Sequence, residues 1–249
     1  KIVSGRIAKI AQPEKDELLL TIKGNRENLR LLISANASLP LLYFTETNKP
    51  SPLTSPNFCM LLRKHIANGR IVSVSQPGLE RIVRIEIEHL DEMGDLKRKF
   101  LIVELMGKHS NIIFCDDENK ILDSIKHISA QVSSVREVLP GREYFIPHAG
   151  EKKDPLTITE EEFKELIGKT PQNLSKALYT DLTGLSPTVS AELCHLASLD
   201  GDISAKDFSD SELTHLYHAF TWIMDDVRQG NFTPNIIYQK EKPVEFASI

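Results

Sequence analysis

Residues 55–87 read SPNFCMLLRKHIANGRIVSVSQPGLERIVRIEI, which predicts a helix, a strand, a tight turn and a second strand. Ser55 is a good N-cap and Pro56 has the fixed φ of a first helical residue, so we expect the helix to begin there. Asn68-Gly69 supplies the stop signal after it. Four apolar residues recur at helical spacing and predict its buried face: Phe58, Cys59, Leu62 and Ile66.

The second strand carries a charge in its apolar phase. We expect strands over Arg70–Gln76 and Leu79–Glu88, joined by a turn at Pro77-Gly78. Alternation in the second strand places Arg81 in phase with its apolar residues, Leu79, Val83, Ile85 and Ile87. Such an arginine either extends its charge to the rim of the sheet or points at a ligand. The pattern alone favours the rim.

Length and composition indicate a globular, cytoplasmic protein. With 249 residues and 41% hydrophobic content, the chain can bury a large core and form two compact units. No apolar run approaches the roughly 18 residues of a membrane helix, so we expect no membrane partner. The three cysteines form no close-spaced pair, which favours reduced thiols over disulfides or a zinc ribbon. Because the sequence opens at Lys1 without a methionine, we expect a fragment of a longer chain.

Charge is distributed unevenly along the chain. The net charge is −5, but residues 1–149 hold 21 Lys+Arg against 18 Asp+Glu, whereas residues 150–249 hold 9 against 17. A mildly basic first half joined to an acidic second half is compatible with one polyanion-binding face. It is also compatible with ordinary solvated surface.

The first 22 residues repeat part of the central stretch. Gly5-Arg6-Ile7 and Gln12-Pro13 recur as Gly69-Arg70-Ile71 and Gln76-Pro77, in both cases 64 positions later (69−5 and 76−12). Short hairpins can converge on such patterns, but matches at one fixed offset favour duplication. We therefore predict an α+β chain in which two copies of a small antiparallel β unit flank the connecting helix.

The second half of the chain changes to helical signals. We expect a β-rich domain over residues 1–149, a helical domain over 155–230 and a linker over 231–249. The helix boundaries rest on cap and stop signals: Thr159-x-x-Glu162 for a helix to Ile167, Thr170-Pro171 for one to Gly184, Ser186-Pro187 for one to about Leu199, and Ser209-x-x-Glu212 for one stopped by Gly230.

Enzyme motifs are missing from this sequence. It has no phosphate-binding glycine loop, no Gly-x-Ser-x-Gly elbow and no His-Glu-x-x-His. His215 and His218 are three apart in a predicted helix, but ordinary helix formers surround them. We therefore predict no catalytic residue, no metal site and no cofactor.

Polar residues in the turns between apolar strands are the candidate site. Arginine and lysine neutralise phosphates, histidine stacks or donates hydrogen bonds, and serine or asparagine fixes backbone orientation, so this inventory suits RNA binding. The alternative is a hydrogen-bonded loop network that holds the two β copies together, above all for Ser110-Asn111. The candidates are Arg63, Lys64, His65, Glu80, Arg81, Lys108, His109, Ser110, Asn111, Asp123, Lys126 and His127.

A second candidate is the turn Gly184-Leu185-Ser186-Pro187 between two predicted helices. Helix-hairpin-helix elements can present backbone N–H groups to a phosphate at a helix N-terminus. Asp181 and Glu192 make these surroundings acidic, and a plain helix–helix corner is the favoured alternative.

Four segments together resemble the NFACT N-terminal domain of RqcH-type ribosome quality-control proteins, long labelled fibronectin- or fibrinogen-binding proteins. They are FCMLLRKH (58–65), LERI (79–82), ELMGKHSNII (104–113) and LPG (139–141). The resemblance implies two β lobes similar to the N-terminal domain of formamidopyrimidine-DNA glycosylases, followed by a helix-hairpin-helix domain. The family's Asp-Arg pair, implicated in tRNA recognition, falls on Glu80-Arg81, where glutamate keeps the charge but moves it by one methylene.

The resemblance also implies partners and a function. A chain of this kind would bind tRNA and the large ribosomal subunit that carries a stalled peptidyl-tRNA, and would recruit tRNA for untemplated C-terminal tailing, with alanine in bacteria. Peptide-bond formation would belong to the ribosome. The competing hypothesis is an adhesin for fibronectin or fibrinogen, as the older family label states. A DNA-repair enzyme is a weaker third reading, because fold does not fix function.

Overall fold

The computed structural model describes residues 1–24, 27–147 and 151–248. The predicted domain boundary at residue 149 and the last residue of the predicted linker, Ile249, lie outside the described residues. The chain forms two compact units, Lys1–Pro77 with Arg81–Pro147 and Gly78–Glu80 with His148–Ile249. We call them the β unit and the helical unit and describe each by itself.

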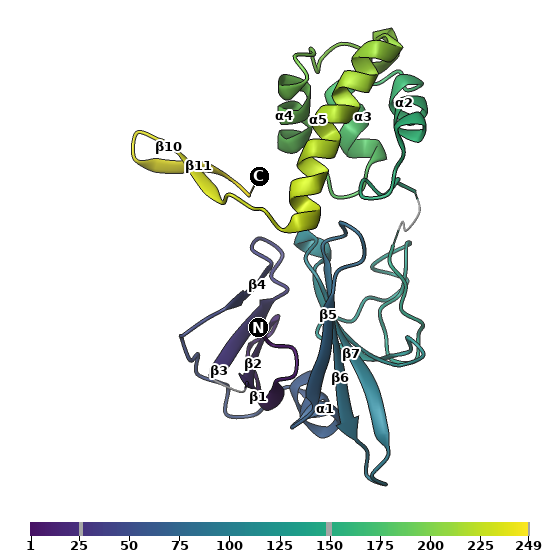
Figure 1. Ribbon diagram of the computed structural model, residues 1–249. Coiled ribbons are helices and arrows are strands. Elements are labelled where there is room, and N and C mark those ends of the chain that lie inside the picture. Colours follow the sequence, from purple (N-terminus) through teal and green to yellow (C-terminus); the bar gives the residue numbers. More distant parts are fainter. Residues whose placement is uncertain (25–26, 148–150, 249) are drawn as a thin grey trace. The chain divides into compact units, whose positions relative to one another are not determined.

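In the described residues of the β unit, nine strands form an antiparallel sheet in the order β4-β3-β2-β1-β5-β6-β7-β8-β9 (Figure 1). Consecutive strands pair along both halves, and β1 and β5 join the halves. The strands are β1 Arg6–Glu14, β2 Glu17–Lys23, β3 Asn28–Ser34, β4 Leu41–Phe44, β5 Arg70–Ser75, β6 Ile82–Leu90, β7 Leu96–Glu104, β8 Asn111–Asp116 and β9 Ile121–Ser124.

The predicted duplication is confirmed, and the two copies share one sheet and one core. The strand pair β1–β5 is in register at Arg6 and Arg70, which are 64 positions apart. Matching β-bulges follow in both copies, after Ile7 in β1 and after Ile71 in β5. Buried residues from both copies form a single cluster, including Leu18, Leu20 and Ile33 from the first and Ile85, Leu101 and Phe114 from the second.

The connecting helix α1 covers Asn57–Ile66 and packs against β1, β6 and β9. Its predicted buried face is confirmed, because Phe58, Cys59, Leu62 and Ile66 all lie in the shared core. The predicted cap is wrong. Pro56 is the N-cap, and the Ser55 hydroxyl instead accepts a hydrogen bond from Arg63 Nη1 at 2.9 Å.

The predicted start of the second central strand is also wrong, whereas its predicted buried phase is confirmed for Ile85 and Ile87. Strand β6 begins at Ile82, so Arg81 lies in an exposed bend before it. Leu79 belongs to the helical unit and packs against that unit's core. Both faces of β6 are covered, because Ile85 and Ile87 enter the shared core while Ile82 enters a second cluster with Ile102, Ile113, Cys115, Ile121 and Val138. Because both faces are covered, burial along β6 does not alternate strictly, and Ile82 and Glu88 are buried as well.

The helical unit contains α2 Glu160–Gly168, α3 Leu174–Asp181, α4 Pro187–Leu196 and α5 Asp210–Gln229 (Figure 1). Three caps are as predicted, with capping boxes at Thr159 and Ser209 and an N-cap at Ser186. The start of α3 differs, because the Asn173 side chain accepts from Lys176 N at 2.9 Å and caps the helix three residues after Thr170.

Residues after α5 form a hairpin where we expected a linker. Gly230 ends α5 with a φ of 71°, and the strands β10 Asn235–Gln239 and β11 Lys242–Ala247 then pair antiparallel. Both strands are exposed along almost their whole length, so no burial pattern marks them in the sequence. None of the helices in the described parts of the chain is long and apolar enough to cross a membrane.

Candidate nucleic-acid interface

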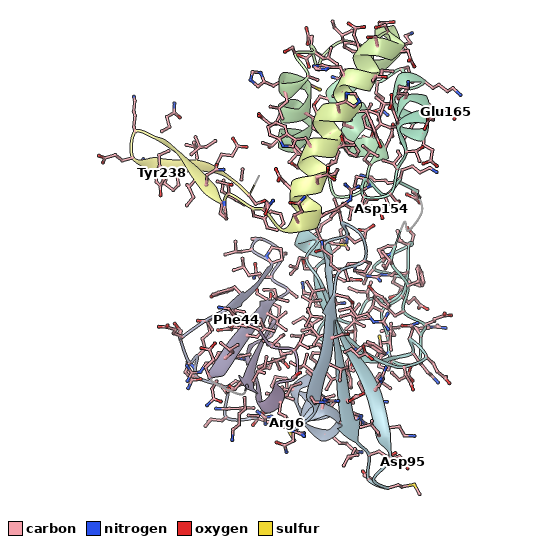
Figure 2. The ribbon with its side chains drawn as sticks, viewed as in Figure 1. Arg6, Phe44, Asp95, Asp154, Glu165 and Tyr238 are labelled. Atoms are coloured by element: carbon pink, nitrogen blue, oxygen red, sulfur yellow. The ribbon has the colours of Figure 1, made fainter. Side chains whose placement is uncertain are left out.

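The candidate residues separate into several places. One group lies where β6 begins, β7 ends, β8 begins and β9 ends. Because neighbouring strands are antiparallel, these four points share one end of the sheet. We call the exposed residues there, Arg81, Lys108, His109 and His127, the strand-end cluster. Figure 2 draws the side chains of the described residues as sticks on the ribbon.

Backbone contacts fix Arg81 beside the Met-Gly-Lys-His-Ser-Asn block. The Arg81 carbonyl accepts a hydrogen bond of 2.9 Å from Leu105 N, which brings the start of β6 next to the end of β7. A short 3-10 helix, η1 Gly107–His109, follows two residues later and leaves Lys108 and His109 exposed. Gly107 has a φ of +56°, which favours glycine at this turn. The arrangement presents three side chains with nitrogen donors to solvent.

Ser110 and Asn111 are buried, and their side chains hydrogen-bond to neighbouring loops of the second β copy. Asn111 Nδ2 donates to the Lys126 carbonyl at 2.9 Å, and its Oδ1 accepts from the backbone N–H groups of Lys126 and Ile112. The Ser110 hydroxyl accepts from Met106 N at 2.8 Å. These side chains therefore hold the loops that carry the strand-end cluster.

Lys126 joins the two β copies at this end of the sheet. Its ammonium donates to the Ser110 carbonyl at 3.0 Å and to the Ala35 carbonyl, which lies just after β3 of the first copy. Burial lowers the pKa of the Lys126 ammonium, and the charge of Asp16 opposes that shift. The neighbouring His127 is exposed and its Nε2 lies 2.6 Å from Asp123 Oδ1.

The residues on α1 point to different parts of the β unit. Arg63 is held in place, since its Nε donates to the Ile10 carbonyl at 2.9 Å. Lys64 is exposed. His65 is partly buried 6.1 Å from the Phe114 ring, and burial, followed by the charge of Lys64, lowers the pKa of its imidazole. Arg63 therefore contacts β1, and His65 lies near the Phe114 ring of β8.

The predicted Glu80-Arg81 pair lies across the boundary between the two compact units. Glu80 belongs to the helical unit and Arg81 to the β unit. Within the helical unit, Gly184 lies against Leu79, since a Cβ on Gly184 would come within 2.5 Å of the Leu79 Cβ. The Gly184 turn is therefore packed against the segment that carries Glu80.

Sequence reasoning missed the contribution of the first copy to this site. The turn between β1 and β2 carries the exposed Lys15 and also Asp16. The charge of Lys15 lowers the pKa of the Lys126 ammonium, and the charge of Asp16 raises it. The offset of 64 could have indicated them, since 15 and 16 correspond to 79 and 80. Among residues 1–24, 27–147 and 151–248, no group of three or more potential metal ligands occurs, and Cys59, Cys115 and Cys194 are free and buried.

These features define a two-unit α+β protein with a candidate polyanion-binding surface on its sheet. A family model described as NFACT N-terminal and middle domains matches residues 1–249. The chain belongs to this family, as its sequence motifs predicted.

Curated relatives extend well beyond this chain. The Rqc2 homolog RqcH of Bacillus subtilis (strain 168) is 37% identical over 237 residues, which cover 95% of this chain and 40% of the relative. The archaeal Rqc2 homolog aRqcH of Methanocaldococcus jannaschii is 26% identical over 246 residues, covering 95% and 34%. The chain therefore spans less than half the length of these relatives.

Solved structures of related proteins have the same fold. The fibrinogen binding protein from Staphylococcus aureus aligns with a TM-score of 0.81 at 31% identity, covering 100% of this chain and 84% of that one. The N-terminal part of the fibronectin/fibrinogen-binding protein from Streptococcus suis gives 0.79 at 30%, with the same coverage. A DNA complex of Lactococcus lactis Fpg aligns with a TM-score of 0.45 at 15% identity, covering 92% of this chain and 74% of that one.

Proposed function

We propose that this chain is an RNA-binding module of ribosome-associated quality control in the cytoplasm. It binds tRNA and the obstructed large ribosomal subunit with its peptidyl-tRNA, and recruits tRNA for untemplated C-terminal tailing of the stalled chain, with alanine as the added residue. The ribosome forms the peptide bonds, so the chain itself acts as a recruiter and not as an enzyme. Membership of the NFACT family and the similarity to Rqc2 homologues support this proposal.

The observation that carries the RNA-binding part is the strand-end cluster. Arg81, Lys108 and His109 are exposed on loops fixed by backbone hydrogen bonds and by the buried Ser110 and Asn111. Arginine and lysine on loops with a fixed backbone bind phosphates without the cost of ordering the loop, and histidine can stack on an unpaired base. The sheet end thus has the chemistry that a tRNA backbone requires.

Salt dependence tests this proposal directly. Neutralisation of phosphates releases counterions, so the affinity for tRNA falls steeply as salt rises from about 50 to about 300 mM. Fluorescence anisotropy with labelled tRNA measures this slope. An affinity that stays constant over the same range would count against phosphate contacts.

Adhesion is the second candidate function, because the two solved relatives are described as fibrinogen- or fibronectin/fibrinogen-binding. One experiment at matched protein concentration distinguishes the two functions. Co-sedimentation with large ribosomal subunits supports the quality-control function, whereas binding only to immobilised fibronectin or fibrinogen supports adhesion.

A further inference from the structure

The only tryptophan of the chain, Trp222, lies on the outer face of α5 and is 64% exposed. The buried face of this helix consists of Leu213, Leu216, Phe220 and Met224. At 100° per residue, Trp222 points almost directly away from Phe220, and the exposed His218 and Asp225 lie one turn before and after it on the same side. Tryptophan is among the residue types enriched at the energetic centres of protein interfaces.

The helical unit that carries Trp222 is acidic. Asp225 and Asp226 follow Trp222 on α5, where Asp225 is paired with Arg228 at 2.5 Å, and the first turn of α2 adds Glu160, Glu161 and Glu162 to the unit. Helices α2 and α5 pack against each other, and Figure 2 shows Glu165 of α2 pointing outward from the helical region. Residues 150–249 hold 9 Lys+Arg against 17 Asp+Glu, so the field of this unit attracts cations and repels phosphates.

We propose that the outer face of α5 around Trp222 is a docking surface for a basic protein, one with an apolar pocket for the indole and a rim of lysine or arginine. Nucleic acid and anionic membranes suit this face poorly, because their phosphates would meet Asp226 and the net negative charge of the helical unit. We take the partner to be a protein of the large ribosomal subunit, and in this respect the proposal rests on the proposed function. The helical unit would then bind protein while the β unit binds RNA.

Hydroxyl-radical footprinting read by mass spectrometry tests the proposal on the full chain. Oxidation of Trp222 is measured for the protein alone, with free tRNA, and with purified large subunits that carry peptidyl-tRNA. We expect oxidation to fall several-fold with subunits and to stay unchanged with tRNA. Protection by tRNA alone would assign the face to RNA and overturn the proposal. An unprotected Trp222 in a chain that co-sediments with subunits would overturn it while leaving the proposed function intact.

Substitutions give a second, independent measurement. Trp222→Ala should weaken co-sedimentation with large subunits about 30-fold, the effect of losing one anchor residue, and should leave tRNA affinity unchanged. Phe232→Ala is the matched control, because Phe232 is an exposed aromatic residue of the same unit outside α5. Equal binding by Trp222→Ala and the parent would overturn the proposal. Failure of the parent to bind subunits at all would instead overturn the proposed function, and this proposal with it.

Discussion

Ile7 and Ile71 occupy equivalent places in the two β copies, and each donates a backbone hydrogen bond of 2.9 Å to a glycine of the other copy. Ile7 N donates to the Gly69 carbonyl and Ile71 N to the Gly5 carbonyl. Ser4 and Asn68 also occupy equivalent places in the two copies, and both have a left-handed backbone conformation, with φ values of 72° and 64°. The two copies are therefore related by a local twofold arrangement at the β1–β5 seam, which explains why one sheet and one core result.

This symmetry predicts equal costs for two substitutions. A Cβ on Gly5 would lie 2.6 Å from Ile22 Cγ2, and one on Gly69 would lie 2.7 Å from Ile87 Cγ2. Gly5→Ala and Gly69→Ala should each lower the free energy of unfolding by about 1–3 kcal/mol, as overpacking does. Urea denaturation measures both values. A large cost at one glycine and none at the other would contradict the symmetric seam.

A buried ion pair fixes the segment after β9. Glu104 is fully buried, where its carboxylate accepts hydrogen bonds from Arg136 Nη2 and from the Tyr144 hydroxyl. Arg136→Met leaves that carboxylate without its cation, so we expect a loss of about 3–5 kcal/mol in unfolding free energy. Urea denaturation also provides the control, since adding Glu104→Gln should recover part of the loss. Parental stability of Arg136→Met alone would be incompatible with this assignment.

We expect substitutions at Asn111 and Lys108, which lie in one loop, to have different effects: one on stability and the other on tRNA binding. Asn111→Ala removes buried hydrogen bonds and should cost about 1–3 kcal/mol of unfolding free energy. The exposed Lys108→Ala should leave the melting temperature near the parental value but reduce tRNA affinity and its salt dependence. Thermal melting and tRNA anisotropy, measured on both variants, check the pair. The opposite pattern would assign Asn111 to RNA and Lys108 to the fold.

The lowered pKa of the His65 imidazole predicts that the protein loses stability on acidification. Burial lowers the pKa of its imidazole below the ordinary value of about 6.5, so the unfolded chain binds more protons and stability falls as pH drops below that value. His65→Gln should therefore lose less melting temperature than the parent between about pH 7.5 and pH 5.5. Identical losses in the two proteins would show that His65 does not contribute.

Local signals predicted much of this fold. The capping residues Thr159, Ser186 and Ser209 determine helix starts through their own hydrogen bonds, and the offset of 64 predicted the duplication. The strand predicted to begin at Leu79 begins at Ile82, because Leu79 and Glu80 belong to the helical unit, a division that only tertiary packing decides. The β10–β11 hairpin was missed because its strands bury almost nothing.

The candidate site was only partly predictable. The residue types indicated RNA contact, but burial decides which of them face solvent. Ser110 and Asn111 turn inward, whereas Lys108 and His109 remain exposed. The bridge from Lys126 to Ala35 joins residues 91 positions apart, and no local pattern predicts such a contact.

Binding of the Arg81→Ala variant to tRNA-loaded large ribosomal subunits tests the central claim most directly. Because Arg81 is exposed outside any strand, its loss should leave the melting temperature nearly intact while affinity falls by about 1–3 kcal/mol. Glu80→Asp, which restores the family's residue, should be tolerated, and Lys97→Ala, an exposed cation on the β6–β7 hairpin, is the control. The proposal predicts that, of these three variants, Arg81→Ala is the one that co-sediments weakly with the subunits. Binding by Arg81→Ala as strong as that of the parent, in the full-length protein, would contradict it.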